Sequence, residues 1–301
     1  MENIRIINKV EIALIHISRD ILTLHIGDKV NPVKYYSEIL GLSVGTVQKA
    51  FDILENEEVI RLSKKGAFGK SVEYTNKEKL IKKADLKSIV GVMPLPYSKR
   101  YEGLATAIKS AFESYGINFY FAYMQGSRVR LKLLKEGIYD FAIMSNLAYL
   151  NSNDKEIKKI ISVGNESYVS KHVLLSVNDN SRKLRVGIDK NSEDQSFLSS
   201  KYYENNKCDF IQVNSDSIIS NLKNNIIDQA ILSIDELEEN YYEGINIKDI
   251  DIKEKELANI AVLVSKKGNT LIESLLKEII NTSEIKAIQE KVLKKEMLPR
   301  Y

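Results

Sequence analysis

The first sixty residues alternate between apolar stripes and turn residues. Between residues 4 and 25 the apolar positions recur every three or four residues, a spacing typical of an amphipathic helix. Gly27 predicts the end of this helix. Asn31 followed by Pro32 predicts the N-cap and first turn of a second helix, which we expect to reach Leu40.

A third helix is predicted after Gly41, with Ser43 as its N-cap. Its apolar positions recur at helical spacing, so we expect all of them to face the core. They are Val44, Val47, Phe51 and Leu54. Two short helices joined by a turn of three or four residues that contains glycine are typical of a helix-turn-helix.

A wing, meaning two short strands around a basic tip, is predicted after these helices. Residues 61–63 and 67–74 are expected to form the strands on either side of Lys64-Lys65-Gly66. Residues 61–83 carry a net charge of +6 in a chain whose total is +3. Such a block is typical of a solvated linker or of a phosphate-binding surface, and the neighbouring helix-turn-helix favours the second.

From residue 88 onward strands alternate with helices, and the alternation repeats once after residue 171. This pattern predicts parallel α/β sheets in two lobes. The expected fold class is therefore α/β overall, with an N-terminal winged helix-turn-helix and a two-lobed α/β domain. The expected boundaries are 1–76 for the winged helix-turn-helix, 77–87 for a charged and partly helical linker, and 88–301 for the two-lobed domain, with lobe 1 over 88–170 and 257–301 and lobe 2 over 171–256.

The composition fits a globular chain with a sizeable core. The chain has 301 residues, of which 44% are hydrophobic and 28% charged, and this length favours two domains. No apolar run approaches the roughly 20 residues of a transmembrane helix. Charged residues near the N-terminus argue against a secretory signal, so we expect a cytoplasmic protein. Cys208 is the single cysteine, which excludes an internal disulfide, and three scattered histidines give no metal-site pattern.

The polar positions of the third helix and of the wing carry candidate chemistry for DNA. A recognition helix offers its outward N-terminal residues to base edges in the major groove. The Gln48 amide is suited to adenine, and Thr46 to a thymine methyl group or a phosphate. For each of these residues, an ordinary exposed helix face is an equally good explanation. The candidate DNA-binding residues are Lys34, Ser43, Gly45, Thr46, Gln48, Lys49, Lys64, Lys65, Gly66 and Lys70.

The run from Tyr36 to Glu55, together with residues 58–60 and 65–68, resembles the DNA-binding domain of GntR-type bacterial regulators. The resemblance covers about residues 10–75 and implies a winged helix-turn-helix that binds a double-stranded operator. That family usually has a basic residue directly after the capping serine, where this chain has Val44. The resemblance therefore does not supply that base contact.

The C-terminal pattern resembles the type 2 periplasmic-binding fold that many bacterial regulators use as an effector domain. More narrowly, the whole chain resembles the YhfZ-type branch of GntR-like regulators through residues 93–98 (MPLPYS) and 124–127 (MQGS). This resemblance implies an effector-binding and dimerisation domain, and hence a small-molecule effector and a homodimer.

Candidate ligand contacts follow from the predicted strand ends. Ligands of open α/β sheets bind beyond the carboxyl ends of the strands, where helix N-termini present free N–H groups. These ends are rich in hydroxyl and amide groups and have arginines nearby, so we expect a small, polar, anionic ligand. Each serine is also explained as a helix N-cap without a ligand. The candidate residues are Pro96, Tyr97, Ser98, Arg100, Gln125, Gly126, Ser127, Arg128, Ser145, Asn146, Asp189, Ser192, Asn214, Ser215 and Ser233.

Together these patterns predict a ligand-responsive transcriptional regulator that binds DNA, with no membrane partner. We expect no catalytic residues, metal or cofactor, because the sequence has no P-loop, dinucleotide-binding turn or nucleophile elbow. One alternative is a metabolite-binding protein or enzyme of the periplasmic-binding fold whose helical appendage does not bind DNA. Another is an exported solute receptor, which the basic wing and the charged N-terminus disfavour.

Overall fold

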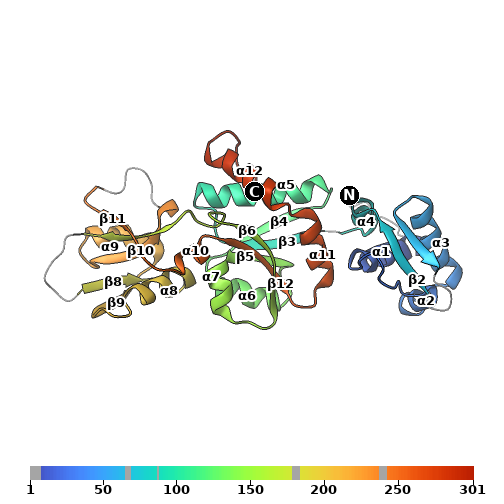
Figure 1. The fold of residues 1–301 in the computed structure, drawn as a ribbon, viewed down its shortest axis with the longest axis horizontal. Helices are drawn as coiled ribbons and strands as arrows, with labels where there is room; N and C mark the ends of the chain where they lie inside the picture. The colour runs from blue at the N-terminus through green and yellow to red at the C-terminus, as the bar shows by residue number, and fades with distance from the viewer. Residues whose placement is uncertain (1–7, 65–68, 87, 178–183, 237–242) are drawn as a thin grey trace, which may run out of the picture. The chain divides into compact units, whose positions relative to one another are not determined.

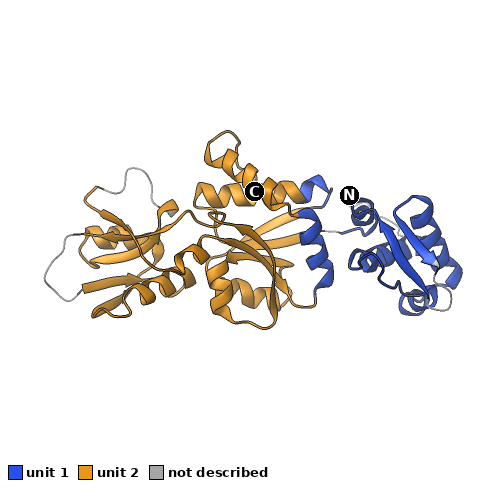
Figure 2. Ribbon diagram, in the orientation of Figure 1, with its two compact units in different colours: residues 1–88, 112–118, 269–279 blue, residues 89–111, 119–268, 280–301 orange. Residues whose placement is uncertain are grey.

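The computed structural model describes residues 8–64, 69–86, 88–177, 184–236 and 243–301. The chain divides into two compact units (Figure 2). The first comprises residues 1–88, 112–118 and 269–279, and the second comprises residues 89–111, 119–268 and 280–301. Across the ranges that the structure describes, no helix is both long and apolar enough to cross a membrane.

The N-terminal part, which we call the head, contains the predicted helix-turn-helix and wing (Figure 1). The apolar stripes of its first and third helices form its core, in which Ile17, Ile21, Val47 and Leu54 are fully buried. Its elements are α1 (Lys9–Leu22), α2 (Val33–Leu40), α3 (Val44–Asn56), β1 (Ile60–Lys64), β2 (Lys70–Thr75) and α4 (Lys77–Lys83).

Local capping explains where the helices of the head begin and end. The Ser43 hydroxyl accepts a hydrogen bond from a backbone N–H in the first turn of α3, which confirms the predicted N-cap. Gly41 ends α2 in the left-handed region, with a φ of 62°. At the start of α2, Pro32 takes the N-cap position instead of Asn31. The Asn31 side chain donates to Asp20 Oδ2 (3.0 Å) and so does not cap the helix.

The segment expected to be a partly helical linker contains the helix α4, which is packed against the head. The strands β1 and β2 pair antiparallel before it, while the tip residues 65–68 lie outside the described residues. Within the following segment, Leu80 and Ala84 are fully buried. The Arg19 guanidinium of α1 donates hydrogen bonds to two backbone carbonyls at the end of this segment (2.8 Å each). The helix α4 is therefore anchored on α1.

Lobe 1 is built on a five-stranded sheet in the order β4-β3-β5-β12-β6. Leu131 and Leu134 of the helix α6 (Ser127–Lys135) pack on one face of this sheet against Val92, Ala142 and Val262. Its strands are β3 (Ile89–Met93), β4 (Phe119–Tyr123), β5 (Phe141–Ser145), β6 (Ile157–Gly164) and β12 (Ala261–Lys266). Its helices are α5 (Lys99–Ser114), α6 (Ser127–Lys135), α7 (Asn146–Ser152) and α12 (Thr282–Leu293), whereas α11 (Thr270–Ile279) belongs to the first unit.

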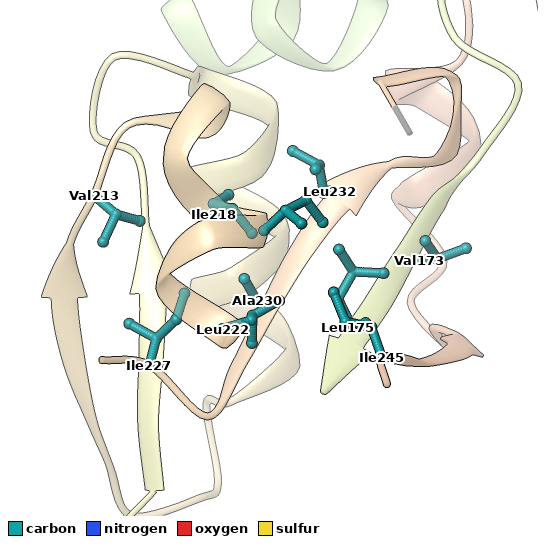
Figure 3. Packing of buried hydrophobic residues seen from close by; sticks show 10 residues of the cluster. Val173, Leu175, Val213, Ile218, Leu222, Ile227, Ala230, Leu232 and Ile245 are labelled. Carbon is teal, nitrogen blue, oxygen red and sulfur yellow. The ribbon is translucent and has the colours of Figure 1, made fainter. Parts of the chain in front are cut away.

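Lobe 2 is built on a second five-stranded sheet in the order β11-β7-β10-β8-β9. Ile218 and Leu222 of the helix α9 (Ile218–Lys223) pack against Val173, Ala230 and Leu232 of the sheet (Figure 3). Its strands are β7 (His172–Ser176), β8 (Leu184–Ile188), β9 (Cys208–Gln212), β10 (Gln229–Ser233) and β11 (Asn246–Asp249). Its helices are α8 (Glu193–Tyr202), η2 (Ser215–Ser217), α9 (Ile218–Lys223), η3 (Ile234–Glu236) and α10 (Lys255–Ala258).

Both sheets are mixed, so the predicted parallel pairing holds only within the strand–helix–strand repeats. In lobe 1, β3 runs parallel to β4 and β5, but β12 runs antiparallel to β5 and β6. In lobe 2, β8 runs parallel to β9 and β10, but β7 runs antiparallel to β10 and β11. The exceptions β7 and β12 are the strands through which the chain enters one lobe from the other. They therefore lie outside the strand–helix–strand repeats from which the parallel pattern was inferred.

Candidate functional site

The N-terminal end of α3 presents short polar side chains. The Ser43 and Thr46 hydroxyls share a hydrogen bond (2.8 Å), and Ser43 Oγ also accepts from the Thr46 backbone N (3.2 Å). Gly45 is exposed, with open space where a Cβ would stand. A phosphate or base edge is therefore able to approach this helix end closely.

The next outward turn of α3 carries Gln48 and Lys49. Gln48 Nε2 donates to Asp52 Oδ1 (2.7 Å), four residues along the helix, which fixes the direction of the amide. Lys49 is exposed. With Thr46, these residues form the outward polar surface that the sequence predicted for α3, which we call the recognition surface.

Val44 differs from its prediction, because its side chain is 57% exposed rather than part of the core. The buried positions of α3 are Val47, Ala50, Phe51 and Leu54. Val44 is the first residue of the helix, and it projects past the end of the core that these four residues contact. An apolar side chain therefore belongs to the recognition surface.

The basic candidates around the wing have different settings. Lys70 Nζ lies 3.7 Å from Glu55 Oε2 and 5.9 Å from the centre of the Phe51 ring, so its charge is partly engaged within the head. Lys34 is exposed and lies 3.8 Å from Glu38 Oε1. Lys64 is the last residue of β1. Lys65 and Gly66 lie outside the described residues.

A cavity of about 780 Å³ adjoins the recognition surface within the head. It is lined by α1, α3 and α4 and includes Thr46. Its other lining residues include the apolar Leu14 and Ile53 and the basic Lys9, Lys49, Lys82 and Lys83. Lys82 pairs with Glu78 (2.6 Å) and Lys83 with Glu57 (2.7 Å). The lysines that line this cavity therefore extend from Lys49 on α3 to Lys82 and Lys83 on α4.

The predicted strand-end residues fall into separate groups, one of which joins the two lobes. Ser145, at the end of β5 in lobe 1, donates its hydroxyl to Asp194 Oδ1 on α8 of lobe 2 (2.6 Å). Arg128 Nε of lobe 1 donates to Glu193 Oε2 of lobe 2 (2.8 Å). The predicted residues Ser145 and Arg128 thus lie at the lobe interface. The predicted Gly126 also lies there, since a Cβ built on it would be 3.6 Å from the backbone oxygen of Asn191 in lobe 2.

Two charged side chains behind this contact are buried. Arg130 on α6 is 3% exposed; its Nη1 donates to the Met124 carbonyl (2.6 Å) and its Nη2 lies 3.5 Å from the Tyr168 hydroxyl. Its Nε has no hydrogen-bond partner among the described residues. Burial raises the pKa of Asp194 to about 7, against the opposing effects of the Ser145 hydrogen bond and the Arg130 charge.

Aromatic rings line one side of this pair. The Tyr168 ring lies edge-on to Tyr101 (5.1 Å between centroids), and Tyr101 lies edge-on to Tyr97 (5.4 Å). Tyr168 and Tyr101 are buried, whereas the predicted Tyr97 is half exposed. The rings therefore run from the surface to the Arg130 guanidinium.

A second group surrounds Asp235, near the strands that connect the lobes. The predicted Arg100 donates to Asp235 Oδ1 (3.4 Å) and to the Glu166 carbonyl. Ser170 Oγ donates to the same carboxylate (2.8 Å), and the predicted Ser233 hydroxyl lies 3.4 Å from it. Arg100 is thus held by protein groups of both lobes.

A third group lies within lobe 2. Asp189 Oδ2 accepts hydrogen bonds from the backbone N (3.0 Å) and hydroxyl (2.7 Å) of Ser215. Two predicted residues therefore contact each other rather than the Arg130–Asp194 pair.

The remaining candidates are dispersed. The Ser98 hydroxyl accepts from the Tyr101 backbone N (3.3 Å), and the Asn146 side chain accepts from Lys159 (2.9 Å). Ser127 is buried at the start of α6, and Ser192 takes the N-cap position of α8 without a side-chain capping bond. Gln125 and Asn214 are exposed, and Pro96 is partly exposed.

The sequence reasoning did not select Arg130 or Asp194 as site residues. Arg130 lies on the same helical face as the buried Leu131 and Leu134, and an arginine on an apolar face was the available signal. Asp194 follows Ser192 in the first turn of α8, where an acidic residue is ordinary. Among the described residues, no three His, Cys, Asp or Glu side chains are grouped so as to hold a metal ion.

Comparison with known proteins gives matches over both parts of the chain. The family model described as "Helix-turn-helix domain" matches residues 25–72, and the one described as "YhfZ C-terminal domain" matches residues 76–301. The curated relative "Uncharacterized protein YhfZ" of Escherichia coli (strain K12) is 26% identical over 300 residues, covering 98% of each chain.

Solved structures give the same picture. The crystal structure of YhfZ from Shigella flexneri has a TM-score of 0.65 at 27% identity, covering 74% of this chain and 97% of that one. The VFT2 domain of Bordetella pertussis BvgS has a TM-score of 0.52 at 14% identity, covering 72% and 98%, and shows likeness of fold alone. The predicted fold class, a helix-turn-helix followed by a two-lobed α/β domain like that of periplasmic-binding proteins, is confirmed. The GntR resemblance of the head stays a prediction.

Proposed function

Because the chain belongs to the YhfZ family, with a helix-turn-helix domain ahead of the YhfZ C-terminal domain, we propose that it is a DNA-binding transcriptional regulator controlled by a small polar ligand. In this proposal the head binds an operator, and the two lobes bind the ligand between them. The protein then acts in the cytoplasm, where the chromosome is, and as a sensor rather than an enzyme.

The observation that carries the DNA-binding role is the recognition surface. Thr46, Gln48 and Lys49 lie outward on a helix whose other face is buried, and Gly45 leaves the helix end accessible. A helix of this kind fits the major groove, with its N-terminal residues at base edges. Lysines on the flank and wing supply the charge that phosphate contacts require.

The ligand role is supported by the buried polar groups at the lobe interface. Arg130 carries a charge into a site where a neutral side chain would cost less to bury, and its Nε lacks a partner among the described residues. A bound anion would satisfy that guanidinium. Such an anion is the ligand class that we expected from the strand ends.

We further propose that the regulator is a homodimer on a pseudo-palindromic site. A single winged head buries little surface on DNA, and two-fold pairing is the commonest way to gain specificity. We keep residues 1–76 as the DNA-binding domain and 88–301 as the effector and dimerisation domain. A monomer in light scattering at micromolar concentration that still binds one half-site tightly would contradict the dimer.

Selection from genomic DNA tests the regulator proposal. Sheared fragments captured by the full-length protein are sequenced, and the affinity of the enriched fragments is measured by fluorescence anisotropy. We expect enriched sites to bind at least about 10³-fold more tightly than random DNA. Lys49→Ala should weaken this binding, and Lys207→Ala, an exposed lysine of lobe 2, serves as the matched control. Equal affinity for enriched and random DNA would refute the proposal.

A further inference from the structure

The buried guanidinium of Arg130 forms no direct ion pair with a described side chain, although its charge acts on the nearby Asp194 carboxyl. Among the described residues, no carboxylate lies within ion-pair distance of Arg130, although the side chain is only 3% exposed. Its contacts are the neutral oxygens of Met124 and Tyr168. A buried cation without a counter-ion is costly, and a carboxylate with two oxygens matches the fork of the guanidinium.

The buried carboxyl of Asp194 has the complementary deficit. It accepts from the Ser145 hydroxyl of the opposite lobe and faces the Ala148 backbone N–H. The Arg130 charge lowers the pKa of this carboxyl, but among the described residues the two groups form no direct ion pair. Arg130 and Asp194 both act on Tyr168: Arg130 through its Nη2 and Asp194 through its charge. The two groups therefore lie in one small cluster without forming a salt bridge.

From this juxtaposition we propose that the ligand of the cleft is a small zwitterion of the amino-acid class, whose carboxylate pairs with Arg130 and whose ammonium group pairs with Asp194. The inference rests on the proposed function, because it specifies the ligand of the same cleft. One molecule with both charges a few atoms apart satisfies both deficits, whereas a simple anion satisfies only Arg130.

The existing lobe contacts show what the ligand would replace. The Ser145 hydroxyl donates a hydrogen bond to the Asp194 carboxyl. Across the same interface, the Arg128 guanidinium donates to the Glu193 carboxylate. Leu147, two residues after Ser145, belongs to the same buried apolar cluster as Val186 and Leu198 of lobe 2. Binding requires the lobes to separate, after which the ammonium group takes the place of the serine hydroxyl on Asp194.

Protonation gives an independent readout of the ammonium contact. The groups facing the Asp194 carboxyl are Ser145, the Ala148 N–H, Arg130, Glu193 and Tyr168. Burial favours the protonated form of Asp194, whereas an adjacent ammonium group favours the carboxylate. Amino-acid binding near neutral pH should therefore release a proton. Calorimetry in buffers of different ionisation enthalpy detects that release.

The test uses the full-length protein and matched probes. Each of the twenty standard amino acids is screened by thermal shift. The best one is then titrated against its analogue without the amino group and its analogue without the carboxylate, with inorganic phosphate as a further anion. We expect the amino acid to bind at least about thirty-fold more tightly than either analogue, the ratio that corresponds to leaving one buried charge unpaired.

Two variants assign the contacts to residues. Arg130→Gln should weaken amino-acid binding at least about thirty-fold, and Asp194→Asn should abolish the proton release and the preference over the deaminated analogue. Lys132→Gln, an exposed change on the same helix, is the control and should leave binding unchanged. Arg130→Gln should leave the unliganded melting temperature unchanged or raise it, because it removes a buried unpaired charge.

Three results would overturn the inference. Equal binding of the deaminated analogue or of phosphate, unaffected by Asp194→Asn, would mean that the ligand is a simple anion; the proposed regulator would then stand. A large fall in unliganded stability for Arg130→Gln but not for Lys132→Gln would make Arg130 a structural residue. If the protein bound no amino acid but still bound DNA specifically, the proposed amino-acid ligand would be refuted and the proposed DNA-binding role would stand.

Discussion

The recognition surface of the head and the interface between the lobes use polar side chains in opposite ways. On α3, Gly45 and Lys49 are exposed around a core that is complete without them. Between the lobes, Arg130, Ser145 and Asp194 are all less than 10% exposed. Polar groups in water contribute little to stability, whereas buried ones change it strongly according to how they are paired.

Because of this difference, we expect DNA binding and stability to depend on different residues in the head, and ligand binding and stability to depend on the same residues in the lobes. Substitutions on the recognition surface should alter DNA binding while the free energy of unfolding stays constant. Substitutions at the buried interface should alter the free energy of unfolding, its pH dependence and ligand binding together. This is common at binding sites whose buried polar groups lack hydrogen-bond or ionic partners.

The largest expected effect is at Asp194. Its pKa is raised to about 7 in the folded protein, from an ordinary value of 3.8, so between these values the folded state holds a proton that the unfolded state has lost. The free energy of unfolding should therefore fall by roughly 3 kcal/mol from pH 5 to pH 8. Asp194→Asn should remove this contribution and be more stable than the parent at pH 8. Urea denaturation at both pH values measures it, and an identical slope in parent and variant would contradict it.

On the recognition surface, Gln48→Ala should change specificity instead of stability. The amide is held by Asp52 in a fixed direction, as a bidentate contact to adenine requires. We expect a loss of about 1–3 kcal/mol of discrimination at one base position. Anisotropy with single-base variants of a selected site measures this, while the melting temperature stays within error. A uniform loss across all sequences would instead make Gln48 a backbone contact.

The wing lysines should affect affinity without changing sequence preference. The double change Lys64→Ala and Lys65→Ala should flatten the dependence of log affinity on log salt by about 1 per lost phosphate contact. The affinity loss between 50 mM and 200 mM salt should then shrink by about tenfold. An unchanged salt slope would exclude the wing from DNA contact.

The smallest effect is expected at Val44, which lies three residues before Val47 on α3. Val44 is 57% exposed and Val47 is fully buried. Val44→Ala should change the free energy of unfolding by less than about 0.5 kcal/mol, and Val47→Ala should lower it by about 2 kcal/mol. Thermal or urea unfolding gives both values. Equal losses would place Val44 in the core, as the sequence pattern had indicated.

Local signals explain how much of the head could be predicted. The Ser43 cap, the Gly41 terminator and the wing strands depend on neighbours in sequence, and the structure has all of them. Val44 was misplaced because helical periodicity does not say where the core ends. Asn31 was wrongly predicted to be the N-cap of α2, because its side chain donates a hydrogen bond to Asp20, eleven residues earlier in the sequence.

The lobes show where sequence reasoning stops. Most strands and helices follow from apolar patterns, but the direction of β12 depends on the return of the chain from lobe 2. Asp194 looks like an ordinary first-turn acid, and only the approach of the other lobe places it against Ser145. Pairs that join distant segments leave no periodic signal in one sequence.

The position of β12 also bears on the order in which a nascent chain completes its sheets. Lobe 2 draws its sheet from one continuous stretch, from His172 to Asp249. The sheet of lobe 1 begins earlier in the sequence, with β3 (Ile89–Met93). It lacks β12, the strand between β5 and β6, until Lys266 has left the ribosome. Synthesis runs from the N-terminus, so the later-starting lobe is the first to have all its strands. During that interval β5 keeps an unpaired edge and β6 has no partner strand, and unpaired strand edges of this kind favour aggregation.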